Sequence, residues 1–164
     1  MKKYIFTFLS VVFIISCKGD LGNSHDIIQV NNENFDEKDI VGTWKLDEFS
    51  YKYLFSYKYF DSISIIFNED RTFKLNNSKD LFKTKSAESL TRDVVQSGII
   101  DNQISEGKWE ITRYENVVNQ LTLFYKDNTN QSGLKVYKKG NEYQIWYFFG
   151  DPDTGERLRF LKGE

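Results

Sequence analysis

The clearest alternation of apolar and polar positions in the chain begins at residues 40–49, IVGTWKLDEF. Trp44 and Leu46 fall on one face of an extended segment and their neighbours fall on the other, which is the period of two of a half-buried strand. Gly42 stands two residues before Trp44, where a glycine in a strand indicates a bend or a close backbone approach. We therefore expect the first strand of the fold here.

The next stretch, residues 51–60 (YKYLFSYKYF), alternates so strongly that one face of a strand would be wholly aromatic. That face would carry Tyr51, Tyr53, Phe55, Tyr57 and Tyr59. Because tyrosine is enriched in the cores of protein interfaces, this face is a candidate binding surface. The alternative is a core strand whose tyrosine hydroxyls lie at its rim.

Short alternating runs continue through the rest of the chain. Residues 62–68 and 72–76 flank a three-residue polar turn and predict a hairpin. Its core face would hold Ile63, Ile65, Phe67, Phe73 and Leu75. Further strands are predicted at 106–114, 120–126, 134–138, 142–149 and 157–162, with turns at 127–133, 139–141 and 150–155.

Residues 78–103 interrupt this pattern, and we expect a long excursion there with one helical piece at about 87–97. The remaining eight or nine short strands, joined by hairpin-length turns, predict an all-β sandwich or a closed barrel.

Three motifs follow one another along the chain: Gly42-Thr43-Trp44, the hairpin segment FNEDRTF (67–73), and the second Gly-x-Trp at 107–109. Their order resembles that of the lipocalin-like domains of bacterial lipoproteins over residues 40–162. The resemblance implies an antiparallel up-and-down barrel of about eight strands with a partly helical insertion. It also implies that Trp44 and Trp109 plug the barrel floor and that an arginine of a late strand, Arg157 or Arg159, packs over the tryptophan. The alternative is that one of the two tryptophans contacts a ligand.

The first 16 residues have the layout of a secretory signal peptide, with two lysines followed by an apolar run that is too short to span a bilayer. The segment IISC at 14–17, followed by Lys18, resembles the lipobox of bacterial lipoproteins. That resemblance implies cleavage before Cys17 and attachment of lipid chains to this cysteine, which together form a stable anchor. Lys18, rather than Asp, favours the outer membrane and leaves the leaflet open. The alternatives are an ordinary signal peptide with a stray cysteine and a short transmembrane stub.

Residues 17–38 are polar and contain too few apolar side chains to form a core, so we expect a lipidated cysteine followed by a flexible tether. His25 lies in this segment and is expected to be a solvated linker residue. The barrel domain would then cover residues 39–164.

The composition bounds the function. The net charge of −2 argues against nucleic-acid binding, which requires a clustered basic surface. The single Cys and the single His both precede the predicted barrel, so no Cys–His or Ser–His pair can form within it. Phosphate-binding and metal-binding motifs are missing from the sequence, and we expect no enzyme activity, no cofactor and no metal.

Two functions remain. The first is a membrane-anchored, non-catalytic binding module that holds a small apolar ligand in the mouth of its barrel. Its difficulty is that 10 Tyr, 14 Phe and 3 Trp could fill the interior of an eight-stranded barrel completely. The alternative is a protein-recognition lipoprotein, such as a toxin-immunity protein or a hydrolase inhibitor.

Overall fold

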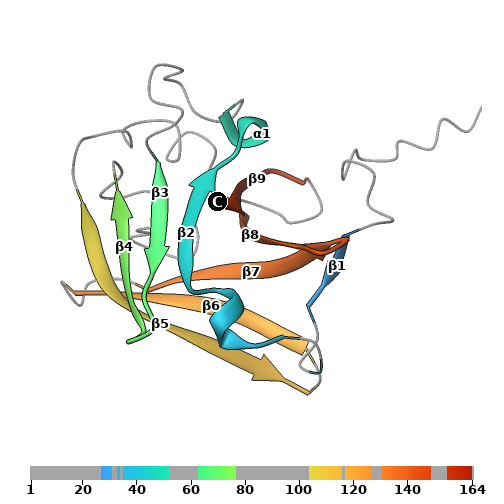
Figure 1. The fold of residues 1–164 in the computed structure, drawn as a ribbon, viewed down its shortest axis with the longest axis horizontal. Helices are drawn as coiled ribbons and strands as arrows, with labels where there is room; N and C mark the ends of the chain where they lie inside the picture. Colours follow the sequence, from blue (N-terminus) through green and yellow to red (C-terminus); the bar gives the residue numbers. More distant parts are fainter. Residues whose placement is uncertain are drawn as a thin grey trace, which may run out of the picture.

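The computed structural model describes residues 27–30, 33, 35–51, 63–76, 104–115, 117–126, 131–148 and 155–163. Within these ranges the chain is almost entirely β (Figure 1). The elements are β1 (Ile27–Gln29), the 3-10 turn η3 (Glu37–Asp39), β2 (Gly42–Leu46), α1 (Glu48–Tyr51), β3 (Ser64–Phe67), β4 (Thr72–Asn76), β5 (Ser105–Tyr114), β6 (Val117–Tyr125), β7 (Gln131–Lys139), β8 (Glu142–Phe148) and β9 (Arg157–Lys162).

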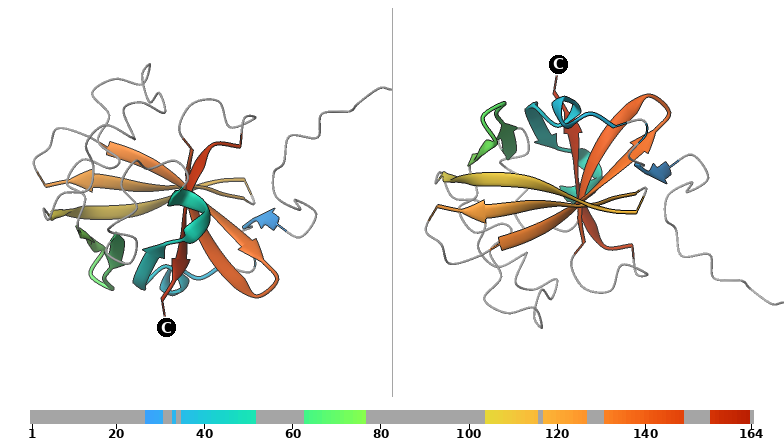
Figure 2. Two further views of the ribbon diagram at one scale, coloured as in Figure 1. Left: turned by 90° about the horizontal axis from the view of Figure 1, so that it is seen from above. Right: turned by 90° about the horizontal axis from the view of Figure 1, so that it is seen from below.

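Strands β2 to β9 form a closed antiparallel barrel. Each pairs with the next in sequence, and β9 pairs with β2 through Leu46 opposite Phe160 to complete the circle. The two views in Figure 2 show the sheet curling around a single interior. The predicted eight-stranded up-and-down barrel is therefore confirmed.

Alternation along the strands sends large apolar side chains into the barrel. All five residues predicted for the core face of the β3–β4 hairpin are buried. The indole nitrogen of Trp44 donates to the carbonyl of Ile40 at 2.7 Å, and that of Trp109 donates to the carbonyl of Asn68 at 3.2 Å. The buried interior set includes Trp44, Ile63, Ile65, Phe67, Phe73, Leu75, Trp109, Leu121, Leu123, Leu134, Val136, Ile145, Leu158 and Phe160. An eight-stranded barrel is just wide enough for such a filling.

Two glycines allow the backbone paths on which this packing depends. Gly42 has φ +127°, a conformation that L side chains rarely adopt, at the bend that leads into β2. Gly107 lies between Phe73 and Tyr125, whose rings meet edge to face at 5.3 Å, and a Cβ at this position would overlap the carbonyl oxygen of Phe124.

The first predicted strand is shorter than expected. It ends at Leu46, and Phe49 and Tyr51 belong to α1. The strand gives way to the helix at Asp47, whose carboxylate accepts a hydrogen bond from the backbone nitrogen of Ser50 at 3.1 Å and so caps the helix. The strand prediction is thus wrong for Tyr51, while Tyr53, Phe55, Tyr57 and Tyr59 lie outside the described residues.

Several other predictions fall partly or wholly outside the described residues. The excursion at 78–103 and its helical piece cannot be placed, and neither can Cys17 or His25. The turn predicted at 127–133 is too long, because residues 131–133 already pair with β6 as part of β7.

The structure also corrects the tether prediction for the described part of residues 17–38. Ile27–Gln29 is a strand on β7, and both Val30 and Phe35 are buried in the core. The start of β6 diverges from β7, and β1 occupies the gap. The backbone nitrogen of Val30 donates to Val136, while its carbonyl accepts from the nitrogen of Val118 at 3.0 Å. The barrel domain therefore begins at about residue 27.

Candidate functional site: a charged cleft beside the first turn

A cleft of about 1100 Å³ lies at the barrel end where β2 begins. We call it the η3 cleft. Its lining comes from three distant parts of the chain: the segment that carries η3, the β3–β4 turn and the strand β5. The lining residues are Glu33, Phe35, Asp36, Glu37, Lys38, Asp39, Val41, Glu69, Arg71, Trp109 and Arg113.

Local hydrogen bonds hold the η3 wall in place. Asp36 accepts from the backbone nitrogen of Lys38 at 3.0 Å, and Asp39 accepts from the backbone nitrogen of Asp36 at 3.0 Å, which is a reciprocal cap. Lys162, from the last strand, donates to the carbonyl of Asp39 at 2.7 Å. The backbone of this wall is thus fixed by the turn itself and by β9.

Two arginines face this wall from the opposite side of the cleft. Arg71 contacts Glu37 at 2.6 Å, and Arg113 approaches the other oxygen of the same carboxylate at 3.5 Å. Arg71 has φ +63° in the β3–β4 turn. In the same turn the hydroxyl and amide of Thr72 bind Asp70 and hold the pKa of that carboxyl below its usual range. These ion pairs are half exposed, so they add little to stability but fix where the charges lie.

Aromatic residues form the side of the cleft next to the barrel. Phe35 is buried, meets Tyr143 edge to face at 5.8 Å and has the Arg113 guanidinium 5.6 Å from its ring centroid. Burial, together with a hydrogen bond to Asp39, raises the pKa of Tyr143 to about 12, so this tyrosine stays neutral at physiological pH.

The chemistry of the η3 cleft is therefore mixed. Five carboxylates and three cations give its lining a net charge of −2, and three apolar side chains lie among them. Such a lining suits a partner that carries both charges and some apolar surface. It does not suit a purely apolar molecule, whose site would be lined mostly by hydrophobic side chains.

The predicted arginines lie elsewhere. Arg157 is buried on the outer face of the barrel, with its guanidinium 4.1 Å from the Trp146 ring and 4.7 Å from Phe49. It does not cover Trp44, over which Lys162 lies at 5.7 Å. The expectation that Arg157 or Arg159 packs over Trp44 is wrong, because β9 points both arginines outward and places Lys162 at the register position opposite Trp44.

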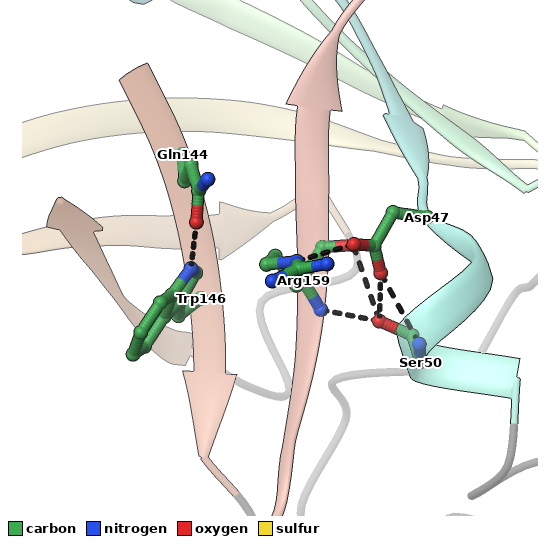
Figure 3. A network of polar contacts seen from close by, with 5 residues as sticks. All are labelled: Asp47, Ser50, Gln144, Trp146 and Arg159. Carbon is green, nitrogen blue, oxygen red and sulfur yellow. Dashed lines mark hydrogen bonds and ion pairs between the residues drawn. The ribbon is translucent and has the colours of Figure 1, made fainter. Parts of the chain in front are cut away.

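Arg159 joins β9 to α1 through a polar network (Figure 3). Its Nε forms a short ion pair with the buried carboxylate of Asp47, which also accepts from the hydroxyl of Ser50 at 2.9 Å. The backbone nitrogen of Arg159 donates to the same hydroxyl at 2.6 Å. Nearby, the indole of Trp146 donates to Gln144 at 3.0 Å. Arg159 therefore has a structural partner and lies outside the η3 cleft.

The cleft residues were not singled out by the sequence pattern, except Trp109. The stretch that forms its acidic wall reads as a tether, and Arg71 reads as part of a plain turn. One local signal was present, since Asp36 followed three residues later by Asp39 has the spacing of a helical cap with an acidic partner.

Among the described residues, no group of three or more His, Cys, Asp or Glu side chains could hold a metal ion. The described part of the chain contains no helix that is long and apolar enough to cross a membrane. Comparisons of the chain with protein-family models, curated proteins and solved structures found no match.

Proposed function

We propose that the protein is a lipid-anchored, non-catalytic recognition module of the bacterial outer membrane, which binds a segment of another protein in the η3 cleft. The anchor is Cys17, and the barrel is a rigid support for the cleft. The choice of partner rests on the contrast between the interior of the described barrel and the η3 cleft. The interior is filled by large side chains, whereas the η3 cleft outside it is lined by charges of both signs.

A polypeptide segment fits this lining better than a small apolar molecule does. Carboxylates from the η3 wall can meet basic side chains of a partner, and the guanidinium groups of Arg71 and Arg113 can meet acidic ones. Phe35, Val41 and Trp109 offer limited apolar contact between them. Complementary charges of this kind set specificity and association rate more than affinity.

A photo-crosslinking experiment tests the proposal. A photoreactive residue replaces Glu69, at the cleft, or Thr112, on the outer face of β5, in cells that express the full chain. We expect one discrete protein adduct from position 69, which is lost when Arg71→Glu and Arg113→Glu are introduced together. The same adducts from both positions, or an adduct at position 69 that persists in the double variant, would contradict a cleft-specific partner.

A small apolar ligand is a second candidate, favoured by two tyrosines at the opposite end of the interior. Tyr125 and Tyr147 are buried where β6 and β8 end, and burial raises the pKa of Tyr147. Two buried phenols at one end of the barrel are polar groups of the kind that orient a ligand in a mostly apolar site. Native mass spectrometry of the chain from Lys18 onward separates the candidates, because a co-purifying lipid supports this one and a stoichiometric protein supports the first.

A further inference from the structure

A second cavity, of about 590 Å³, lies across β4, β5 and β6 and is separated from the η3 cleft by the β3–β4 turn. We call it the β5 groove. Its lining residues are Asn68, Thr72, Phe73, Lys74, Glu106, Gly107, Lys108, Phe124, Tyr125 and Lys126. None of them belongs to the lining of the η3 cleft.

The strand register explains the groove. Thr72, Lys108 and Phe124 form one cross-strand row on the outer face. Lys74 and Glu106 begin a second row, in which Lys126 follows through its backbone bond to Glu106. Rows separated by two residues are about 7 Å apart along a strand. The row between them points inward and has Gly107 at its centre, so the groove lies between two outward rows.

The described lining of the groove carries an excess of positive charge. Lys74, Lys108 and Lys126 form no ion pair or side-chain hydrogen bond with the residues that the structure describes. Among the described lining residues the only carboxylate is that of Glu106, which leaves a net charge of +2 in a chain whose total is negative. Phe124 is 38% exposed at the edge of the same groove, although large apolar side chains are mostly buried in this barrel.

We propose that the β5 groove binds a small amphiphilic anion, a molecule with an apolar body and a carboxylate, sulfonate or phosphate head. The apolar body lies against Phe124 along the groove, and the head is held by Lys108 with Lys74 and Lys126 on either side. An anion is favoured over a cation because three ammonium groups outnumber the single carboxylate. This site is independent of the proposed partner in the η3 cleft.

Titration of the chain from Lys18 onward, within which all described contacts lie, with 8-anilinonaphthalene-1-sulfonate tests the proposal. Binding is followed by fluorescence, and decanoate and decyltrimethylammonium serve as competitors of equal chain length. We expect decanoate to displace the probe and the cation to leave it bound. Replacing Lys108→Gln should weaken probe binding about threefold, the size of one exposed ion pair. The triple lysine-to-glutamine variant should weaken it by about tenfold or more.

The most decisive part of the test is whether removing a negative charge and removing a positive charge change the affinity for the probe in opposite directions. Glu106→Gln should tighten binding about twofold, whereas Lys45→Gln and Lys139→Gln, on other exposed parts of the sheet, should leave it unchanged. Phe124→Ala should weaken binding, and Tyr114→Ala, at a more exposed aromatic, should not. All the substituted residues are on the surface, so the thermal midpoint should stay constant. Equal displacement by both competitors, or a Glu106→Gln variant that binds less well, would overturn the proposal.

Two sources of such an anion can be distinguished. Co-flotation with phosphatidylglycerol vesicles, compared with phosphatidylcholine vesicles, tests whether lipid in a bilayer is bound. Flotation that depends on Lys108 assigns the head group to a membrane lipid. Displacement by decanoate without flotation assigns it to a free amphiphile. If decanoate does not displace the probe and the protein does not float with the vesicles, the proposal is overturned.

Discussion

At the scale of single residues, Trp44 has the clearest structural role. It is fully buried, and its indole nitrogen is satisfied by Ile40. Trp44→Ala should lower the free energy of unfolding by about 3–5 kcal/mol, because it leaves a large cavity and an unpaired carbonyl. Urea denaturation measures this, with Tyr114→Ala as the control at an exposed aromatic. A Trp44→Ala variant as stable as the control would show that the indole is not part of the core.

Tyr143 makes a prediction about alkaline pH. Its folded pKa of about 12 is higher than the ordinary value of 10, so the native state favours the neutral phenol. The resulting stabilisation is complete below about pH 10 and is lost as the pH rises toward 12. The urea concentration at the unfolding midpoint should therefore decrease as the pH is raised from about 9.5 to about 11.5, a range set by these two pKa values. Tyr143→Phe should reduce that fall, and an equal fall in both proteins would assign it to other groups.

Sequence reasoning at this scale identified which residues are buried better than what they contact. The hairpin core was predicted from the period of two, and the resemblance to lipocalin-like domains implied that Trp44 and Trp109 lie in the interior; all of these residues are buried. The residue that packs over Trp44 was not predicted correctly, because a contact between β2 and β9 depends on the register of these two strands. A shift of one residue in β9 would exchange its inner and outer faces, turning the arginines inward and placing Leu161 or Gly163 opposite Trp44 instead of Lys162.

At the scale of elements, β1 is the part of the structure that the sequence pattern concealed. Three residues cannot show a period, and their partners in β7 lie more than 100 positions later in the chain. The segment nevertheless closes the gap between β6 and β7 and buries Val30. By contrast, α1 had a local signal, since Asp47 followed by Ser50 at the third helical position is a typical cap.

Deleting β1 tests its contribution. A chain that starts at residue 31 should be less stable than one that starts at residue 18 by about 2–3 kcal/mol, the value of burying one valine with its strand bonds. The free energy of unfolding in urea measures the difference. A chain that starts at residue 24 is the matched control, because it removes no described contact and should be as stable as the longer chain. If all three chains unfold at the same urea concentration, β1 is dispensable and the original tether boundary is right.

At the scale of the whole molecule, the barrel could be predicted from the sequence and the candidate site could not. A meander of antiparallel strands repeats one local pattern, so each strand can be recognised from its own alternation of apolar and polar residues. The η3 cleft has no such pattern. Its wall at Glu37 meets Arg71 and Arg113, which are 34 and 76 positions away, only after the barrel has closed. The β5 groove likewise depends on three strands taking one register.

The proposed lipid anchor at Cys17 would determine how the whole molecule is oriented at the membrane. Ile27, where β1 begins, pairs with Lys139 at the end of β7, and neighbouring Lys138 lies 5.0 Å from the ring of Tyr143 beside the η3 cleft. The chain therefore enters the barrel at the cleft end. Ile27 lies ten positions after Cys17, a distance of at most about 36 Å along a fully extended chain. Lipid attached to Cys17 would hold the η3 cleft near the membrane.

Cys17→Ala tests this arrangement in cells. The variant should lose metabolic labelling with a lipid precursor and move from the membrane fraction to the soluble fraction, because cleavage and acylation both require the cysteine. The barrel should keep the same thermal midpoint, since no described contact involves this residue. In the wild type, the photoreactive residue at position 69 should capture a membrane-associated partner, and in Cys17→Ala this adduct should decrease while binding of the purified domain is unchanged. A variant that still sediments with membranes in a detergent-sensitive way would show that the protein is held there by something other than lipid on Cys17.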